Sequence, residues 1–396
     1  MLPAIALFAL TYILMLTFSK YRPYIALGSA LIFIVTGMLP VNEIFGAIDF
    51  NVLLMIAGTM GLVALFIESK MPELLADLIM EKVPNVMWAA VALSLFSGVI
   101  SAFVDNVATV LMVAPVAMQI CKKLKTNPVP FIIGIAVSSN LPGAATLVGD
   151  TTAIMLGSYA NMSFLDFFWY KGRPSIFFAV ELGAILSAFI LAFLFRKEKG
   201  AIPKGTRTQV TDYVPTVLLS GTVVLLILAS FLPEKPEITN GLICMFFFLI
   251  GLVREVVRSG SREVVGRAIL EIDFYTLALL AGLFGVNGGI SRAGIIDLLG
   301  SALAGISGDG SRWSVFIVYT VIVWMSVLCS AFIDNIPYTA TMLPVVAVVT
   351  ERLSAAGGLT VEPNLMYFGL LVGATLGGNL TPIGASANIT GIGILR

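Results

Sequence analysis

Long apolar runs separated by short polar loops fill the chain from its first residues to its last. A membrane-spanning helix needs about 20 consecutive apolar residues. Runs of about this length predict spanning helices at 2–18, 24–40, 50–68, 174–196, 213–232, 236–253, 272–290 and 364–379. Two shorter segments, 71–83 and 262–270, are amphipathic, and we expect them at the membrane surface. The pattern therefore predicts an all-α polytopic membrane protein.

Two other apolar stretches, 86–121 and 312–352, are each interrupted midway by an Asp-Asn pair. An ionised carboxylate at mid-membrane costs at least about 2.5 kcal/mol on insertion scales. Non-helical backbone is tolerated at that depth only where it lines a cavity or is packed in protein. We therefore expect, in each stretch, two half-penetrating helices that meet at a hairpin tip near the midplane. The pairs at the tips are Asp105-Asn106 and Asp334-Asn335.

These hairpin tips are the first candidate site. Asp, Asn and the nearby Thr109 or Thr339 offer hard oxygen ligands for Na⁺, or a carboxylate that carries a proton. The alternative is that each pair only caps the following helix at a membrane interface. Because the pairs recur at matched positions, we favour the functional interpretation.

Broken helices form the second candidate site. Gly, Pro and small hydroxyl residues interrupt 128–161 and 364–396 and predict unwound segments, whose ends expose N–H groups to anions and carbonyls to cations. Close helix packing by small residues is the alternative, but it requires no acidic or amide side chain at the break. The candidate residues are Asn140, Thr146, Gly149 and Asp150, and in the second segment Asn379, Thr381, Gly384, Ser386 and Asn388.

The chain also repeats itself. Ile48-Asp49-Phe50 returns as Ile272-Asp273-Phe274, the first tip returns as the second, and Gly149 corresponds to Gly384. Landmarks that recur in the same order indicate a duplication. Positive charge marks cytoplasmic loops, and counting helices between the basic clusters places Asp49 outside and Asp273 inside. The repeats are thus predicted to be inverted, as in many secondary transporters, with parallel repeats as the alternative. The clusters predicted to be cytoplasmic are 196–207, 254–267, 122–125 and Lys20-Arg22, with the N-terminus outside.

Composition narrows the function classes. Hydrophobic residues make up 58% of the chain and charged residues 12%, with a mean hydropathy of +1.00. A soluble domain carries about 25% charged residues, so a soluble globular protein, a nucleic-acid binder and a disordered chain are excluded. There is no His to shuttle protons, and nothing pairs a nucleophile with a base, so we expect no enzyme and no cofactor. The three Cys are scattered and are expected to be small buried hydrophobes. We expect no cleavable signal peptide.

Four segments together resemble a known group of permeases: Ser-Ala-Phe-Val-Asp-Asn (101–106), Gly-Ala-Ala-Thr-Leu-Val-Gly-Asp (143–150), 330–344 and 377–388. They are similar to the melanosomal P-protein and arsenical-pump (ArsB-type) permeases of the ion transporter superfamily. That superfamily also contains NhaD-type Na⁺/H⁺ antiporters and citrate and dicarboxylate–sodium symporters. The resemblance covers nearly the whole chain and specifies the superfamily more than the substrate.

The resemblance implies a scaffold, a mobile transport domain with two opposed re-entrant hairpins, homodimers and elevator-type alternating access. It also implies a further spanning helix after Arg396, and Na⁺ at Asn106, Asp334, Asn335 and Asn388. Pro-Pro-Asn of P-protein-like members is replaced here by Thr151, Thr152 and Ala153, which weakens the case for Na⁺ in the first half. The expected divisions are 1–40 (scaffold helices), 41–196 (first repeat, hairpin about 86–121 and broken helix about 128–161), 197–212 (cytoplasmic linker) and 213–396 (second repeat, hairpin about 312–352 and broken helix about 364–396).

Charge at the candidate site discriminates between substrates. The inferred site holds Asp105, Asp150 and Asp334 and no Lys or Arg. A dicarboxylate would therefore meet three acids, opposed only by helix dipoles worth roughly 1 kcal/mol each. We expect H⁺-coupled efflux of arsenite or antimonite, with Na⁺/H⁺ exchange second, sodium-coupled citrate or dicarboxylate transport third, and a passive channel as a separate alternative. The expected setting is a bacterial or archaeal cytoplasmic membrane, with lipid and a second copy as partners and no nucleic acid.

Overall fold

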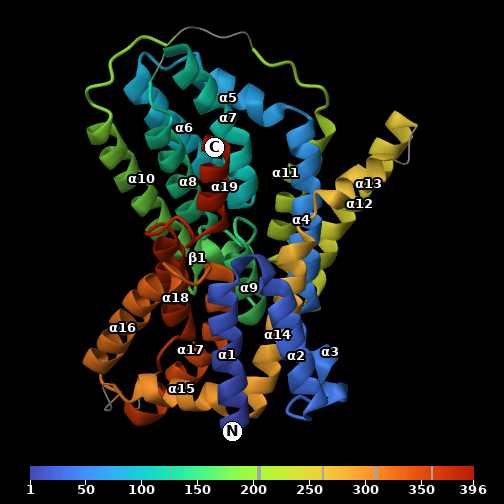
Figure 1. The fold of residues 1–396 in the computed structure, drawn as a ribbon, viewed down its shortest axis with the longest axis vertical. Helices are drawn as coiled ribbons and strands as arrows, with labels where there is room; N and C mark the ends of the chain where they lie inside the picture. Colours follow the sequence, from blue (N-terminus) through green and yellow to red (C-terminus); the bar gives the residue numbers. More distant parts are fainter. Residues whose placement is uncertain (125, 203–206, 261–262, 307–309, 358–359) are drawn as a thin grey trace. The chain divides into compact units, whose positions relative to one another are not determined.

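The computed structural model describes residues 1–124, 126–202, 207–260, 263–306, 310–357 and 360–396. Helices dominate this part of the chain (Figure 1), and its only strands are the antiparallel pair β1 (Trp169–Tyr170) and β2 (Arg173–Pro174). The all-α prediction is confirmed. Among the basic residues predicted to be cytoplasmic, Lys125, Lys204, Arg262 and the side chain of Arg267 lie outside the described part. The helices group into two compact units.

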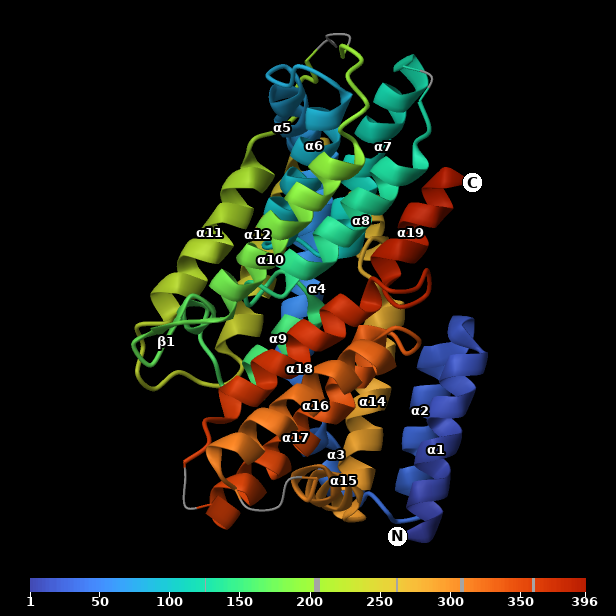
Figure 2. The ribbon, with the colours of Figure 1, turned by 90° about the vertical axis from the view of Figure 1, so that its left-hand side faces the viewer.

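Unit 1 comprises residues 1–53, 158–160 and 273–384. Within it α2 runs along α14, and α16 runs along α18 (Figures 1 and 2). Its helices, besides the first turn of α4, are α1 (Leu2–Thr17), α2 (Arg22–Val35), α3 (Ile44–Ala47), α14 (Phe274–Arg292), α15 (Ile295–Ala304), α16 (Arg312–Ser330), α17 (Asn335–Gly357) and α18 (Pro363–Gly378), with 3-10 turns at Ser19–Tyr21 and Val41–Glu43.

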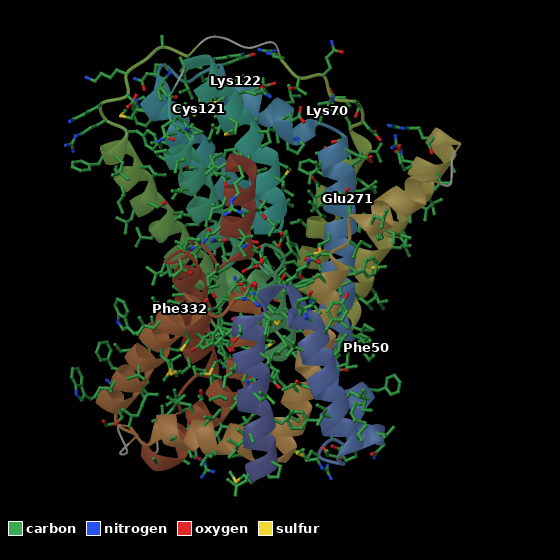
Figure 3. The ribbon with its side chains drawn as sticks, in the orientation of Figure 1. Phe50, Lys70, Cys121, Lys122, Glu271 and Phe332 are labelled. Carbon is green, nitrogen blue, oxygen red and sulfur yellow. The ribbon has the colours of Figure 1, made fainter. Side chains whose placement is uncertain are left out.

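Unit 2 comprises residues 54–157, 161–272 and 385–396. Here α6 packs on α8, and the last helix, α19, packs on α7 and α8. Lys122 of α7 lies at the same end of this unit as Lys70, in the link between α4 and α5 (Figure 3). The helices are α4 (Phe50–Glu68), α5 (Met71–Met80), α6 (Val86–Ser101), α7 (Asn106–Leu124), α8 (Val129–Gly143), α9 (Thr151–Tyr159), α10 (Ile176–Leu194), α11 (Val214–Ala229), α12 (Thr239–Ser259), α13 (Glu263–Leu270) and α19 (Ser386–Leu395), with a 3-10 turn at Leu165–Phe167.

Glycines bring equivalent helix pairs into backbone contact in both units. A Cβ atom on Gly282 of α14 would lie 2.6 Å from the backbone nitrogen of Leu27 in α2. A Cβ atom on Gly58 of α4 would lie 2.5 Å from the carbonyl carbon of Cys244 in α12. Small residues at membrane helix interfaces permit this close approach. The sequence duplication is thus accompanied by the same packing device in each unit.

Helix lengths correct two expectations. Six described helices are long and apolar enough to span a membrane: α4, α7, α10, α12, α14 and α16. The two helices expected to span at the N-terminus, α1 and α2, have only 16 and 14 residues and meet at a bend of 118°, so together they count as at most one broken span. The spans expected at 213–232 and 364–379 correspond to α11 and α18, which have 16 residues each and also fall outside the six. The helices beside the tips, α6, α7, α16 and α17, have 16, 19, 19 and 23 residues. At 1.5 Å per residue they are about 24–34 Å long, so they are longer than the half-spans expected from the sequence.

Candidate functional site

At each Asp-Asn pair the aspartate is the last residue of a short link between two helices, and the asparagine begins the second helix. Asp105 precedes α7, and its Oδ1 accepts the backbone N–H groups of Val107 at 2.9 Å and Ala108 at 3.3 Å. Asp334 precedes α17, and its Oδ1 accepts the N–H of Ile336 at 3.4 Å. Both aspartates therefore cap the following helix, which is the alternative role considered for them. In both tips it is Oδ1 that accepts these capping bonds.

In unit 2 the first tip meets a chain of three amides. Asn106 Nδ2 donates to Asn140 Oδ1 at 3.0 Å, and Asn140 Nδ2 donates to Asn388 Oδ1 at 3.3 Å. Asn106 is the first residue of α7, Asn140 lies in the last turn of α8, and Asn388 lies in the first turn of α19. The fold thus gathers three predicted site residues that are far apart in sequence. Asn106 and Asn140 are buried. Buried amides retain such a linked arrangement because an unsatisfied amide costs about 1–3 kcal/mol.

The break between α8 and α9 is pressed directly against this tip. Thr146 Oγ1 donates to the carbonyl of Ala102, in the α6–α7 link. A Cβ atom on Gly149 would lie 2.6 Å from Gly143 O, 2.7 Å from Ser101 O and 2.8 Å from Ala102 O. Only glycine permits this approach. Thr146 and Gly149 thus position the break, and their contacts with the tip are contacts with backbone atoms.

The second repeat builds the same junction within unit 1. Thr381 Oγ1 donates to the carbonyl of Ala331, and a Cβ atom on Gly384 would lie 2.7 Å from Gly378 O and 3.1 Å from Ala331 O. The label on Phe332, the residue after Ala331, marks the position of this tip in Figure 3. The duplication detected in the sequence therefore extends to individual hydrogen bonds.

A small cavity opens beside the first tip. Its volume is about 10 Å³, roughly the space for one water-sized species. Two carboxylates, Asp105 and Asp150, line it together with hydroxyl-bearing Thr59 and Thr151. Asp150 is buried, and its Oδ2 accepts the hydroxyl of Thr152 at 2.7 Å. The other lining residues are Ile56, Met60, Val63, Val148, Gly149 and Ile154, so none of the described residues that line the cavity is basic.

The second tip has a different partner, which sequence analysis missed. Arg22 Nη1 donates to Asp334 Oδ2 at 2.9 Å, and both side chains are buried. The count of helices between basic clusters predicted that Arg22, like Lys20, faces the cytoplasm, and it gave Arg22 no role in the site. In the structure Arg22 is the first residue of α2, and its side chain is buried. The premise that no Lys or Arg reaches the predicted site residues is therefore wrong.

Other predicted residues occupy supporting positions. Thr109 Oγ1 donates to the carbonyl of Asp105 at 3.0 Å, one turn back in its own helix. Thr339 is buried, and its hydroxyl has no hydrogen-bond partner among the described residues. Asn379 is the C-cap residue directly after α18, and Ser386 is the first residue of α19. The predicted set divides between the units: unit 2 holds Asp105, Asn106, Thr109, Asn140, Thr146, Gly149, Asp150, Ser386 and Asn388, and unit 1 holds Asp334, Asn335, Thr339, Asn379, Thr381 and Gly384.

Residues 12–373 match the CitMHS family, which is described as citrate transporter. The chain belongs to the CitMHS family. It is therefore a membrane transporter, and the predicted resemblance to the P-protein group of the ion transporter superfamily is confirmed.

Several proteins are similar to this CitMHS protein along most of its length. An uncharacterized transporter of Mycobacterium tuberculosis is 29% identical over 99% of this chain and 90% of its own. A 46 kDa membrane protein of Mycobacterium leprae is 28% identical with the same coverage. Human P protein is 28% identical over 88% of this chain and 49% of its own. Integral membrane localisation is thus confirmed, and the bacterial relatives indicate a cytoplasmic membrane.

The YdaH transporter of Alcanivorax borkumensis has a similar fold. Its crystal structure superposes on the CitMHS protein with a TM-score of 0.55 and 14% sequence identity, covering 90% of this chain and 79% of that one. This likeness concerns the fold alone. It agrees with the all-α polytopic architecture of the described helices.

Polar and charged contacts hold residues 207–212, which we call the strap, against two helices of unit 2. Arg207 binds Glu81 of the α5 end through two hydrogen bonds, and Thr208 binds Asp77 at 2.7 Å. Asp212 forms ion pairs with Arg254 and Arg258. Burial acts to raise the pKa of the Asp212 carboxyl, but hydrogen bonds from Arg254 and the Val214 N–H, with the charges of both arginines, lower the pKa overall. The 207–212 segment is therefore fixed to α5 and α12 by charge.

Proposed function

We propose that this CitMHS protein is a secondary active transporter in which the first tip and first break bind a coupling cation, H⁺ or Na⁺, while an oxygen-rich substrate is carried. The observation that carries the proposal is the cavity lined by Asp105 and Asp150. Two carboxylates that line one small space favour a bound cation or a shared proton, because a positive charge beside them offsets their mutual repulsion.

The donor set of the cavity suits a small hard cation. Carboxylate and hydroxyl oxygens are the ligands that alkali and alkaline-earth ions prefer. Among the described residues, no group of three or more His, Cys, Asp or Glu side chains gathers as for a structural zinc or calcium centre. A proton or a monovalent cation therefore fits the lining better than a divalent metal.

The amide chain beside the cavity supports recognition of an oxygen-rich substrate. Asn106, Asn140 and Asn388 bring neutral donors and acceptors to the same tip that carries Asp105. Neutral amides bind oxyanions without requiring a proton, and they tolerate a cation nearby. Cation binding at the carboxylates then reduces the repulsion that an anionic substrate meets, which couples the two events.

Citrate is the substrate that we propose first. The family is described as citrate transporter, and the electrostatic argument against a carboxylate counted three uncompensated aspartates. Arg22 compensates Asp334, so that count overstated the negative charge. When the coupling cation is bound at Asp105 and Asp150, the remaining repulsion between these carboxylates and a carboxylate substrate is also reduced.

Arsenite efflux, the substrate and direction ranked first from sequence, is the second candidate. The described cavity lining holds no basic side chain. This favours arsenite, because neutral arsenous acid needs no positive partner and binds hydroxyls and amides. Na⁺/H⁺ exchange without an oxyanion is the third outcome. Elevator-type movement in a homodimer is carried over from the family resemblance as part of the proposal.

The test is transport by purified protein in liposomes. Labelled citrate, arsenite and Na⁺ are each followed under imposed pH and Na⁺ gradients. The proposal predicts citrate accumulation against its gradient when, and only when, the cation gradient is present. Flux that follows the substrate gradient alone, whatever the cation gradient, indicates a passive channel and contradicts the proposal.

Matched variants assign the site. Loss of one charged partner costs about 1.5–3 kcal/mol, so Asp105→Asn and Asp150→Asn should each weaken cation dependence by about 10- to 100-fold. Asp297, an exposed acidic residue in the first turn of α15, supplies the control. Asp297→Asn should transport normally. Normal coupling in both Asp105→Asn and Asp150→Asn would contradict the proposed site.

A further inference from the structure

The two tips share one construction, and at the second tip a buried arginine meets the second oxygen of the aspartate. Both aspartates cap a helix through Oδ1, and both tips are held by a Thr–carbonyl hydrogen bond from the break. At the second tip, Arg22 lies 2.9 Å from Asp334 Oδ2. Asp105 at the first tip lines a cavity in which none of the described lining residues is basic.

The second repeat also lacks the other polar groups of the first. When Gly143, Thr146 and Gly149 are matched to Gly378, Thr381 and Gly384, Asn140 corresponds to Thr375 and Asp150 to Ala385. The carboxylate pair and the middle amide therefore occur in the first repeat alone. What the second tip has in addition is a fixed guanidinium.

Arg22 is held firmly in place by unit 1. Its Nε donates to the carbonyl of Met15, near the end of α1, at 3.3 Å. Tyr275 Oη donates to the carbonyl of Ser19, in the α1–α2 link, at 2.5 Å. Tyr12 Oη donates to the carbonyl of Pro337, in the first turn of α17, at 2.9 Å. The α1–α2 link is thus bonded to α14, and α1 to α17, around the ion pair.

A guanidinium held this way has the charge of a bound cation but cannot dissociate. Arg remains protonated in proteins, and its planar fork suits carboxylates. Its position beside Asp334 supplies the charge that a coupling cation would supply at the first tip. A second cation at Asp334 would meet this fixed positive charge at close range and be repelled.

We infer that Arg22 is a tethered substitute for a coupling cation at the second tip, so that the transporter has one exchangeable cation site, at Asp105 and Asp150, in place of two. This inference rests on the proposed function. Arg22 is accordingly a positioning residue that sets the number of coupling ions, through its effect on Asp334.

The experiment measures citrate flux in liposomes as a function of Na⁺ and of H⁺ concentration. A system with one site gives a Hill coefficient of about one, and two coupled sites allow a value of up to about two. We expect about one for the wild type. Arg22→Gln frees Asp334 to bind a cation, so its coefficient should rise towards two and its half-saturating cation concentration should increase. Arg22→Gln/Asp334→Asn, with both charges removed, should return to about one.

Controls separate this role from a purely structural one. Arg292 forms an exposed ion pair with Glu43 in the same unit, so Arg292→Gln should change neither flux nor coefficient. Asp334→Asn alone, which keeps Arg22, should transport more slowly with a coefficient of about one and unchanged half-saturation. These two readouts remain available if Arg22→Gln does not fold.

The outcomes are distinct. Loss of all cation dependence in Asp334→Asn would show that Asp334 itself binds the coupling cation, and this overturns the inference. A coefficient of about one in a folded Arg22→Gln also overturns it, as does a double variant that keeps the raised coefficient. Wild-type flux without any cation dependence instead refutes the proposed function on which the inference rests.

Discussion

Replacing Gly149 by alanine places a methyl carbon among three backbone carbonyls at the junction of tip and break. The added Cβ would lie 2.6, 2.7 and 2.8 Å from the oxygens of Gly143, Ser101 and Ala102. Ordinary carbon–oxygen contacts are longer, and backbone atoms of packed helices cannot rotate away. Overpacking of this kind costs about 1–3 kcal/mol or more. We expect the free energy of unfolding to fall by at least about 2 kcal/mol, with loss of coupled flux.

Alanine at two further glycines should give smaller changes in the free energy of unfolding than alanine at Gly149. Gly384→Ala should be milder, because its closest contact would be 2.7 Å and the next ones 3.1 Å. Gly28 lies in α2 with nothing within 4 Å of an added Cβ, so Gly28→Ala should be neutral or stabilising by up to about 1 kcal/mol. Thermal unfolding in detergent and liposome flux are the assays. A Gly149→Ala protein with wild-type unfolding and flux would refute the tip–break contact.

Three more predictions concern other parts of the molecule. Asn140→Ala should lower the free energy of unfolding by about 1–3 kcal/mol and weaken cation dependence, whereas the helix cap variant Asn85→Ala should cost about 1 kcal/mol with normal transport; equal effects on transport would contradict the amide chain. The lowered pKa of Asp212 contributes stability that is present above its unfolded value of 3.8 and is lost as pH falls through the lower folded value. Asp212→Asn should therefore melt earlier at neutral pH and show a flatter acid dependence of Tm, and an unchanged profile would contradict the strap. In a background without the native cysteines, Gly200→Cys should be labelled by impermeant reagents from the cytoplasm only, and labelling from outside would reverse the topology.

Much of the fold follows from the hydrophobic pattern. Apolar runs located the helices because burial in lipid selects long apolar segments. Repetition of tips and breaks identified residues that meet in space: Asn106 and Asn140 are hydrogen-bonded across two helices of the first repeat. Motif spacing could do this because each tip and its break pack against each other inside one repeat.

What the sequence could not give is which distant helix faces a tip. Arg22 and Asp334 are 312 positions apart, and beside Lys20 the arginine has the pattern of a basic cytoplasmic cluster. Asn388 reaches Asn140 from the other repeat, although the pattern predicted only that it lines a break. Helix lengths beside the tips were also underestimated, because polarity at a tip indicates a cavity without fixing its depth.

The most direct test of the central claim is reversal of substrate flux by the cation gradient. Liposomes with equal citrate on both sides are given an inward and then an outward gradient of the coupling cation. The account predicts net citrate movement whose direction follows the cation gradient in the wild type, and no net movement in Asp105→Asn or Asp150→Asn. Net citrate movement that is absent in the wild type, or unaltered in both variants, would contradict it.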